Sequence, residues 1–146
     1  MSFDSLIRQL GEETGTGLSL SETGTCGVIF GDNEVDFEEY DGRLFIYASI
    51  GPCEGREDLF AAALAANHLG ADTGFAALGI DTTHGVFTLS RVLEGDIDYQ
   101  RFQYALVAFV EALQDWKTRL IEAPPSPAAE TASSNDFANV TSFMQV

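Results

Sequence analysis

Basic residues are scarce in this 146-residue sequence. Seven Lys and Arg stand against 23 Asp and Glu, which gives a formal net charge of −16. A surface with this charge repels phosphate backbones and anionic lipid head groups, so the composition argues against nucleic-acid binding and membrane-surface binding. The acidity is typical of a surface that keeps a protein soluble, and it would also offset exposed apolar area or match a basic partner.

Cysteines and long apolar runs are also few. Two cysteines cannot form a disulfide framework. No apolar run approaches the roughly 20 residues that a membrane-spanning helix needs, so no membrane insertion is expected. The first ten residues, MSFDSLIRQL, include an acidic residue and no long apolar stretch, unlike a signal peptide. The sequence therefore predicts a soluble, reduced, intracellular protein.

Hydrophobic residues are plentiful at 45%, including eleven Phe, so a folded core is expected. We predict one domain over residues 1–121. From 122 to 146 the composition becomes rich in Pro, Ala and Ser, which predicts a disordered tail. Within it Phe137, Val140 and Met144 have a spacing that could form one apolar helical face on binding a partner.

The apolar residues recur at spacings that predict an α+β domain. A period of three to four residues indicates a helix, and a period of two indicates a strand. Glycines and the Asp41-Gly42 pair mark the turns. The predicted order is α-βββ-α-ββ-α with a mostly antiparallel five-stranded sheet. The expected helices cover residues 3–15, 57–69 and 102–120, and the expected strands cover residues 26–30, 34–40, 43–50, 75–81 and 86–93.

The strand over residues 43–50 is apolar on both of its faces. Leu44, Ile46 and Ala48 alternate with Phe45 and Tyr47, so one sheet face covered by helices leaves the last two without a partner. The residues 57–69 add a helix rich in alanine. This surplus of apolar surface predicts a homodimer, a surface that binds a client protein, or both.

Cys53 is the strongest candidate for a catalytic residue. It lies before a predicted helix N-terminus and near Arg56, two features that favour a thiolate. A nucleophile also needs a base, and the available histidines are poorly placed: His68 lies about 20 Å along the helix, and His84 in a hairpin turn. We interpret Cys53 as part of a helix-entry turn, and we expect no enzymatic activity.

No metal or cofactor pattern is convincing. The two cysteines and two histidines lack the close ligand spacing of a zinc site. The acidic run that begins at Asp32 does not match a calcium-binding loop. Its sixth residue is Phe37, where such a loop has glycine, and its twelfth is Arg43, where such a loop has glutamate. Its carboxylates are more simply a solvated strand face, and the glycines form no phosphate-binding motif. We therefore expect no cofactor.

Residues 62–93, AALAANHLGADTGFAALGIDTTHGVFTLSRVL, resemble the middle signature of the class I type III secretion chaperones, the CesT/Tir-chaperone family. The opening helix, CGVIF, the acidic strand, the Gly-Pro before the second helix, and the last helix ending in VEALQDWKTRL follow in the family's order. The resemblance covers about residues 3–120. The residues that carry it are Asn67, Thr73-Gly74, Leu78-Gly79-Ile80-Asp81, Gly85, Leu89-Ser90-Arg91 and Leu93.

The resemblance implies a homodimeric, non-enzymatic protein of the bacterial cytoplasm. It would bind the N-terminal chaperone-binding segment of one or more secreted effectors, keep it extended and soluble, and deliver it for secretion, with the secretion-system ATPase as a further candidate partner. The family's dimer is built around the second helix and a nearby late strand. We carry that role to Leu59, Ala63, Leu64 and Leu89.

Client binding in the family uses apolar patches of the first helix and the sheet, and core packing is the alternative role for each matching residue. Phe75 stands where the family often has a second glycine, which puts the local turn in question. Two other functions stay open: a small α+β enzyme or ligand-sensing domain with a pocket near Cys53, and a regulatory partner on the same fold. The client-binding candidates are Leu6, Leu10, Val28, Phe30 and Phe37.

Overall fold

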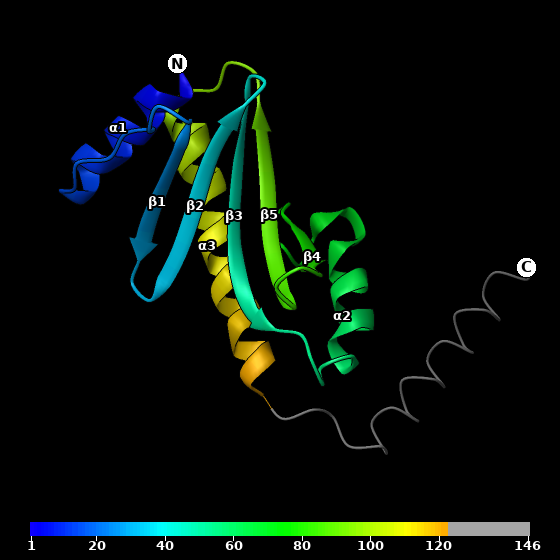
Figure 1. Cartoon of the computed structure of the whole chain (residues 1–146). Helices are drawn as coiled ribbons and strands as arrows, with labels where there is room; N and C mark the ends of the chain where they lie inside the picture. Colours follow the sequence, from blue (N-terminus) through cyan, green and yellow to red (C-terminus); the bar gives the residue numbers. More distant parts are fainter. Residues whose placement is uncertain (123–146) are drawn as a thin grey trace, which may run out of the picture.

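The computed structural model describes residues 1–122 and has the predicted α+β order (Figure 1). The predicted tail, with Phe137, Val140 and Met144, lies outside the described residues apart from residue 122. Within residues 1–122 no helix is long and apolar enough to cross a membrane. The elements are α1 (Phe3–Thr14), β1 (Thr25–Phe30), β2 (Asn33–Tyr40), β3 (Arg43–Pro52), α2 (Asp58–Asn67), the 3₁₀ turn η1 (His68–Gly70), β4 (Ala77–Asp81), β5 (Val86–Glu94) and α3 (Tyr99–Ile121).

The five strands form one sheet in the order β1-β2-β3-β5-β4, and every neighbouring pair is antiparallel. Tyr40 pairs with Arg43 across the two-residue turn between β2 and β3. Both turn residues have positive φ, 53° at Asp41 and 72° at Gly42. This is the geometry that Asp-Gly favours, because it matches the twist of the strands, so the predicted hairpin is confirmed.

The helices pack on one face of the sheet. In Figure 1 α3 runs behind the central strands, and α2 lies beside β4. The rings of Phe37 on β2 and Phe102 on α3 are 6.2 Å apart, and those of Phe60 on α2 and Phe87 on β5 are 5.8 Å apart. On β3 the side chains that face the helices are buried, whereas Tyr47 on the opposite side is 40% exposed. The second face therefore carries no helix of residues 1–122.

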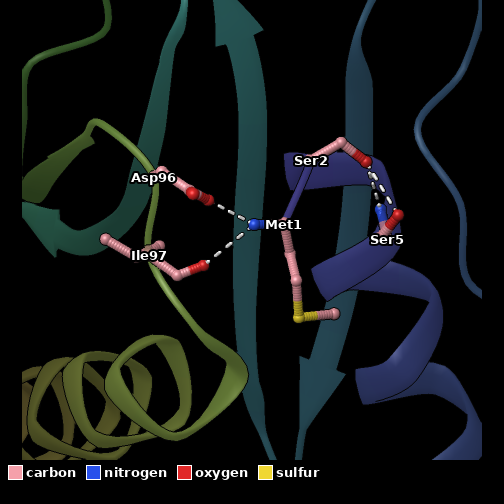
Figure 2. Close-up of polar contacts among 5 residues, drawn as sticks. All are labelled: Met1, Ser2, Ser5, Asp96 and Ile97. Atoms are coloured by element: carbon pink, nitrogen blue, oxygen red, sulfur yellow. Dashed lines mark hydrogen bonds and ion pairs between the residues drawn. The ribbon is translucent and has the colours of Figure 1, made fainter.

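The start of α1 is tied to the connection between β5 and α3 (Figure 2). The chain's amino group donates to the carboxylate of Asp96 and to the carbonyl of Ile97. The hydroxyl of Ser2 accepts a hydrogen bond from the N–H of Ser5 at 3.2 Å, which caps the first turn. The charged amino group lowers the pKa of Asp96. These contacts fix the end of α1 that lies next to the sheet.

The segment between α2 and β4 differs from the prediction. The second helix ends at Asn67, two residues early, because Leu69 adopts φ 57° and interrupts it. The strand begins at Ala77 and not at Phe75, because Phe75 also has a positive φ, 63°. Glycine adopts this conformation readily, whereas a bulky side chain is strained in it. The turn at Phe75 is thus retained without the glycine.

The last helix agrees closely with its predicted apolar seam. Asp98 caps it by accepting a hydrogen bond from the N–H of Arg101 at 2.8 Å, and α3 begins at Tyr99, three residues earlier than predicted. Leu120 is half-buried at the far end of the seam. The Leu120 side chain lies against Gly51. A Cβ at position 51 would clash with this side chain and displace it. The buried seam residues are Phe102, Leu106, Phe109, Leu113 and Trp116.

Leu6→Ala should lower the free energy of unfolding by about 2–5 kcal/mol, because it leaves a cavity where α1 meets the sheet. Urea denaturation followed by circular dichroism, at one protein concentration, measures the change. Ile121→Ala is the control: its side chain is exposed, and the expected change is within about 0.5 kcal/mol. Equal effects of the two substitutions would contradict the assignment of Leu6 to the core.

Candidate functional site

An apolar groove lies between α2 and the edge strand β4. Its volume is about 290 Å³, and its surface is almost entirely apolar. Leu64 stands at its rim with 74% of its surface exposed, and Ile80 on β4 is also exposed. Exposed apolar area of this kind marks a contact surface when it is contiguous. The groove is lined by Phe60, Ala63, Leu64, Asn67, Leu78, Gly79, Ile80 and Phe87.

The helix α2 buries little of itself in this protomer. It has the sequence DLFAAALAAN, yet Ala66 is the one residue within it that is buried. Of the predicted dimer residues, Leu59 and Ala63 are half-buried and Leu64 is exposed. Leu89 is fully buried, paired between Ala48 on β3 and Leu78 on β4. The predicted dimer set is thus split between a free surface and the protomer's own core.

Asn67 closes the outer edge of β4 beside this groove. Its side chain accepts from the N–H of Leu78 at 2.8 Å and donates to the carbonyl of Leu78 at 3.0 Å. An unpaired strand edge would otherwise offer these groups to another strand. The sequence places Asn67 on the stripe of the second helix and in the family resemblance, but its spacing does not predict this contact, because its partner is eleven residues away. A partner at this edge must therefore contact side chains rather than the backbone of Leu78.

A second apolar groove lies between α1 and α3. Its volume is about 310 Å³, and Leu10, Phe30 and Val107 contribute apolar side chains to it. Val107 on α3 is 51% exposed, and Phe30 on β1 is half-buried. Glu13 and Glu111 also line the groove and place carboxylates beside the apolar surface. Two of the predicted client-binding residues thus meet at one surface.

The other three predicted client-binding residues do not reach a surface. Leu6 and Phe37 are fully buried, and Val28 is nearly so. Their side chains belong to the core that joins the sheet to α1 and α3. Their client-binding role stays a prediction, but this arrangement offers a partner no access to them. The family resemblance pointed to apolar faces of these elements, and a face of that kind packs the core before it serves a partner.

The uncovered face of the sheet carries both acidic and aromatic side chains. Glu34, Asp36 and Glu38 of β2 point to it, next to Phe45 and Tyr47 of β3. Partial burial, and then the neighbouring Glu34, raise the pKa of Asp36. Burial followed by the nearby carboxylates of Asp36 and Glu38 raises the pKa of Tyr47. Burial is the first cause of both pKa shifts, and the neighbouring carboxylates on this face add to it.

Cys53 is held in the connection before α2, as the helix-entry interpretation expects. Its N–H donates to the carbonyl of Gly85 at 3.0 Å, which brings this connection close to the turn that holds His84. The imidazole of His84 instead contacts Asp81 at 2.6 Å, and Arg56 forms an ion pair with Asp58 at 3.0 Å. No hydrogen bond joins the Cys53 thiol to a base within residues 1–122. Burial raises the pKa of the other thiol, Cys26.

Metal-ligating side chains do not gather in the described part of the chain. Within residues 1–122 no three His, Cys, Asp or Glu side chains are placed to hold an ion. The carboxylates of the acidic strand β2 alternate along its outer face, so they spread over the strand instead of converging. The chemistry that the described residues support is thus apolar contact flanked by carboxylates.

Comparison with protein families gives a match over residues 5–117, to the model of the Tir chaperone protein (CesT) family. The chain belongs to the CesT family. This confirms the resemblance inferred from residues 62–93, and it places the chain in a family of chaperones rather than of enzymes. Comparison with curated protein sequences gives no significant match.

Solved structures share the fold of this CesT-family chain. A chain of the ExsC–ExsE complex aligns with a TM-score of 0.70 and 20% identity, over 86% of this chain and 100% of that one. A chain of the HopA1–SchA chaperone–effector complex aligns with a TM-score of 0.66 and 16% identity, over 80% of this chain and 93% of that one. A chain of the ExoU–SpcU heterodimer from the type III secretion system of Pseudomonas aeruginosa aligns with a TM-score of 0.59 and 18% identity. This alignment covers 82% of this chain and 94% of that one. At these identities the likeness establishes the common fold.

The contact between Glu13 and Tyr99 at the α1–α3 groove predicts a high-pH titration. The Tyr99 hydroxyl donates to Glu13 at 2.9 Å. Burial, and then this hydrogen bond, raise the pKa of Tyr99 from 10.0 to about 12. The protonated phenol is favoured in the folded state, so its contribution to stability is fully present below pH 10.0 and is lost as the pH rises through about 12.

Ultraviolet absorbance of the phenolate against pH measures this. The native protein should show a tyrosine step near pH 12 that Tyr99→Phe removes. In urea-unfolded protein the same step should return to about pH 10, the ordinary range of tyrosine. A step near pH 12 that persists in Tyr99→Phe would contradict the role of this contact.

Proposed function

We propose that the protein is a type III secretion chaperone of the bacterial cytoplasm that acts without catalysis. As a homodimer it binds the N-terminal segment of one or more effector proteins and keeps that segment extended and soluble. The secretion-system ATPase is the partner to which it then delivers its client. The observation that carries the proposal is the CesT-family match over residues 5–117, in a protomer that leaves two apolar grooves open.

The α2–β4 groove supports a dimer with two-fold symmetry. Such an interface presents the same patch from both copies, so a protruding side chain must find a groove in that patch. Leu64 protrudes beside the groove that contains Ala63 and Ile80. A second copy would cover the apolar part of α2 that one protomer leaves exposed. Burying one leucine at such a site contributes about 1.5–3 kcal/mol before the cost of association.

The α1–α3 groove supports a client site. It is separate from the α2–β4 groove, so one protomer can contact a second copy and a client together. An effector segment in extended form exposes apolar side chains, and Phe30 with Val107 offers a place for one of them. The aromatic strip of Phe45 and Tyr47 on the uncovered sheet face is a further surface along which the same segment could continue.

Leu64→Asp should convert the dimer to a monomer, because it places a charge at the centre of an apolar interface. Light scattering coupled to size exclusion measures the change, from about twice the 15.7 kDa chain mass to that mass. Leu69→Asp is the matched control: Leu69 is also exposed, at 81% against 74% for Leu64, but does not line the groove. A dimer that survives Leu64→Asp, or that both substitutions abolish, would contradict this interface.

A bound effector should be recovered with the protein from its source bacterium and identified by mass spectrometry. Its N-terminal segment, produced separately, should bind the purified dimer in calorimetry. Val107→Asp should weaken that binding about tenfold or more, because one buried apolar anchor is lost, and leave the dimer intact. Ile121→Asp, on the same helix but outside the groove, should have no effect.

Cys53→Ser tests the alternative function in the same assay. Because its thiol has no base within hydrogen-bond reach in the described residues, client binding should stay unchanged. A large loss would favour a ligand or catalytic site at Cys53. Recovery of the chain alone, with no larger protein bound, would speak against the chaperone function itself.

A further inference from the structure

A third groove lies where β5 extends beyond β4. The pairing of β5 with β3 continues to Glu94, whereas its pairing with β4 ends at Ser90. The last residues of β5 therefore have no strand beside them on the β4 side, and the turn at Phe75 and the first half of α3 form the other walls. The groove has a volume of about 510 Å³ and has more polar surface than the two apolar grooves.

Two arginines, Arg91 on β5 and Arg101 on α3, line this groove. The sequence has six arginines, and the other four each pair with a carboxylate. Within residues 1–122, Arg91 and Arg101 have no carboxylate within ion-pair distance, although 23 acidic residues are present in the chain. Glu94 also lines the groove, but its carboxylate contacts Arg43 at 2.6 Å. Two unneutralised cations thus share one groove of an acidic protein.

Arg91 is held in position within the groove. One terminal nitrogen of its guanidinium donates to the carbonyl of Gly74 at 2.8 Å. Gly74 lies against α3, where a Cβ would clash with the carbonyl of Ala108. Because no buried side-chain polar atom in residues 1–122 lacks a partner, the guanidinium nitrogens of Arg91 that make no hydrogen bond are not fully buried, and Arg91 lines the groove. Burial lowers the pKa of Arg91; the nearby Tyr104 opposes this shift and the neighbouring Arg101 adds to it. An anion placed between the two guanidinium groups would offset their mutual repulsion.

Aromatic side chains stand on both sides of these cations. Phe75 is 69% exposed, and it is held at φ 63°, a conformation that bulky residues rarely adopt. Tyr104 on α3 is exposed as well, and Val92 of β5 also lines the groove. A strained, exposed aromatic residue is unexplained by the stability of the fold, because glycine would fit the turn without strain. The groove therefore offers apolar contact beside two hydrogen-bonding cations.

We propose that this groove binds a peptide segment in which an acidic side chain adjoins an apolar one, its carboxylate held by Arg91 and Arg101 and its apolar neighbour packed on Phe75 and Tyr104. That the segment belongs to an effector rests on the proposed function. Guanidinium groups recognise carboxylates through paired hydrogen bonds, which suits this arrangement. Nucleic acid is a poor occupant, because the net charge of −16 repels a polyanion and two arginines are too few to offset it.

A peptide array with the full-length protein tests the groove without any effector. Its peptides are capped at both ends and contain one Glu flanked by Phe, Leu or Val, beside identical peptides with Gln in place of Glu. The protein should prefer the Glu members, a preference that its overall charge opposes and only a local site can produce. Arg101→Gln should weaken binding of the Glu peptides about tenfold, to the level of the Gln peptides, since a charge-assisted hydrogen bond is lost.

Two further variants make the result specific. Phe75→Gly should weaken both peptide sets while leaving the fold at least as stable, because glycine relieves the positive φ. Arg8→Gln, which removes an arginine already paired with Asp4, should change nothing.

The proposal is overturned if Glu and Gln peptides bind alike, or if the preference for Glu survives in Arg101→Gln. Displacement of the peptides by inorganic phosphate alone would assign the groove to a free anion. Loss of the dimer in Arg101→Gln would assign it to a second copy. A negative result in the peptide array would overturn the proposed groove but not the chaperone function, which the co-purification of an effector tests separately.

Discussion

All the helices of the described chain pack on one face of a five-stranded antiparallel sheet, and the rest of the molecule follows from this. The covered face takes the apolar side chains of β2, β3 and β5 and joins them to α1 and α3 around Phe37 and Phe102. Burial of these side chains is the main favourable term in folding. No helix of residues 1–122 covers the opposite face. Phe45 and Tyr47 on that face therefore do not pack against a helix.

The same arrangement explains why most of α2 is not buried in a single protomer. It sits at the edge of the sheet, where it contacts the short strand β4 and, through Phe60, Phe87 of β5. Only Ala66 is buried, although the helix is almost wholly apolar. Asn67 then closes the backbone of β4, which favours association through side chains over continuation of the sheet. In the proposed homodimer, dimerisation and client binding would use different surfaces.

The net charge of the protein does not describe how its individual charges are paired. Most arginines are neutralised by a neighbouring carboxylate, and the acidic excess lies on the solvated faces. Against that background, two unpaired guanidinium groups beside Phe75 form a local positive site. At the proposed peptide site, the balance of these local charges, more than the net charge, would decide which segments are preferred.

The sequence by itself determined the order of elements, the hairpin at Asp41-Gly42, the seam of α3 and the family, because periodicity and turn chemistry are local and because small motifs recur in a set order. It could not tell which apolar residues were core and which were surface. Leu6 and Leu10 belong to one stripe of α1, yet only Leu10 also borders a groove. Likewise Arg91 and Arg101 lie ten residues apart and meet only because β5 and α3 pack together. Tertiary structure decided these points, since exposure depends on what the rest of the chain covers.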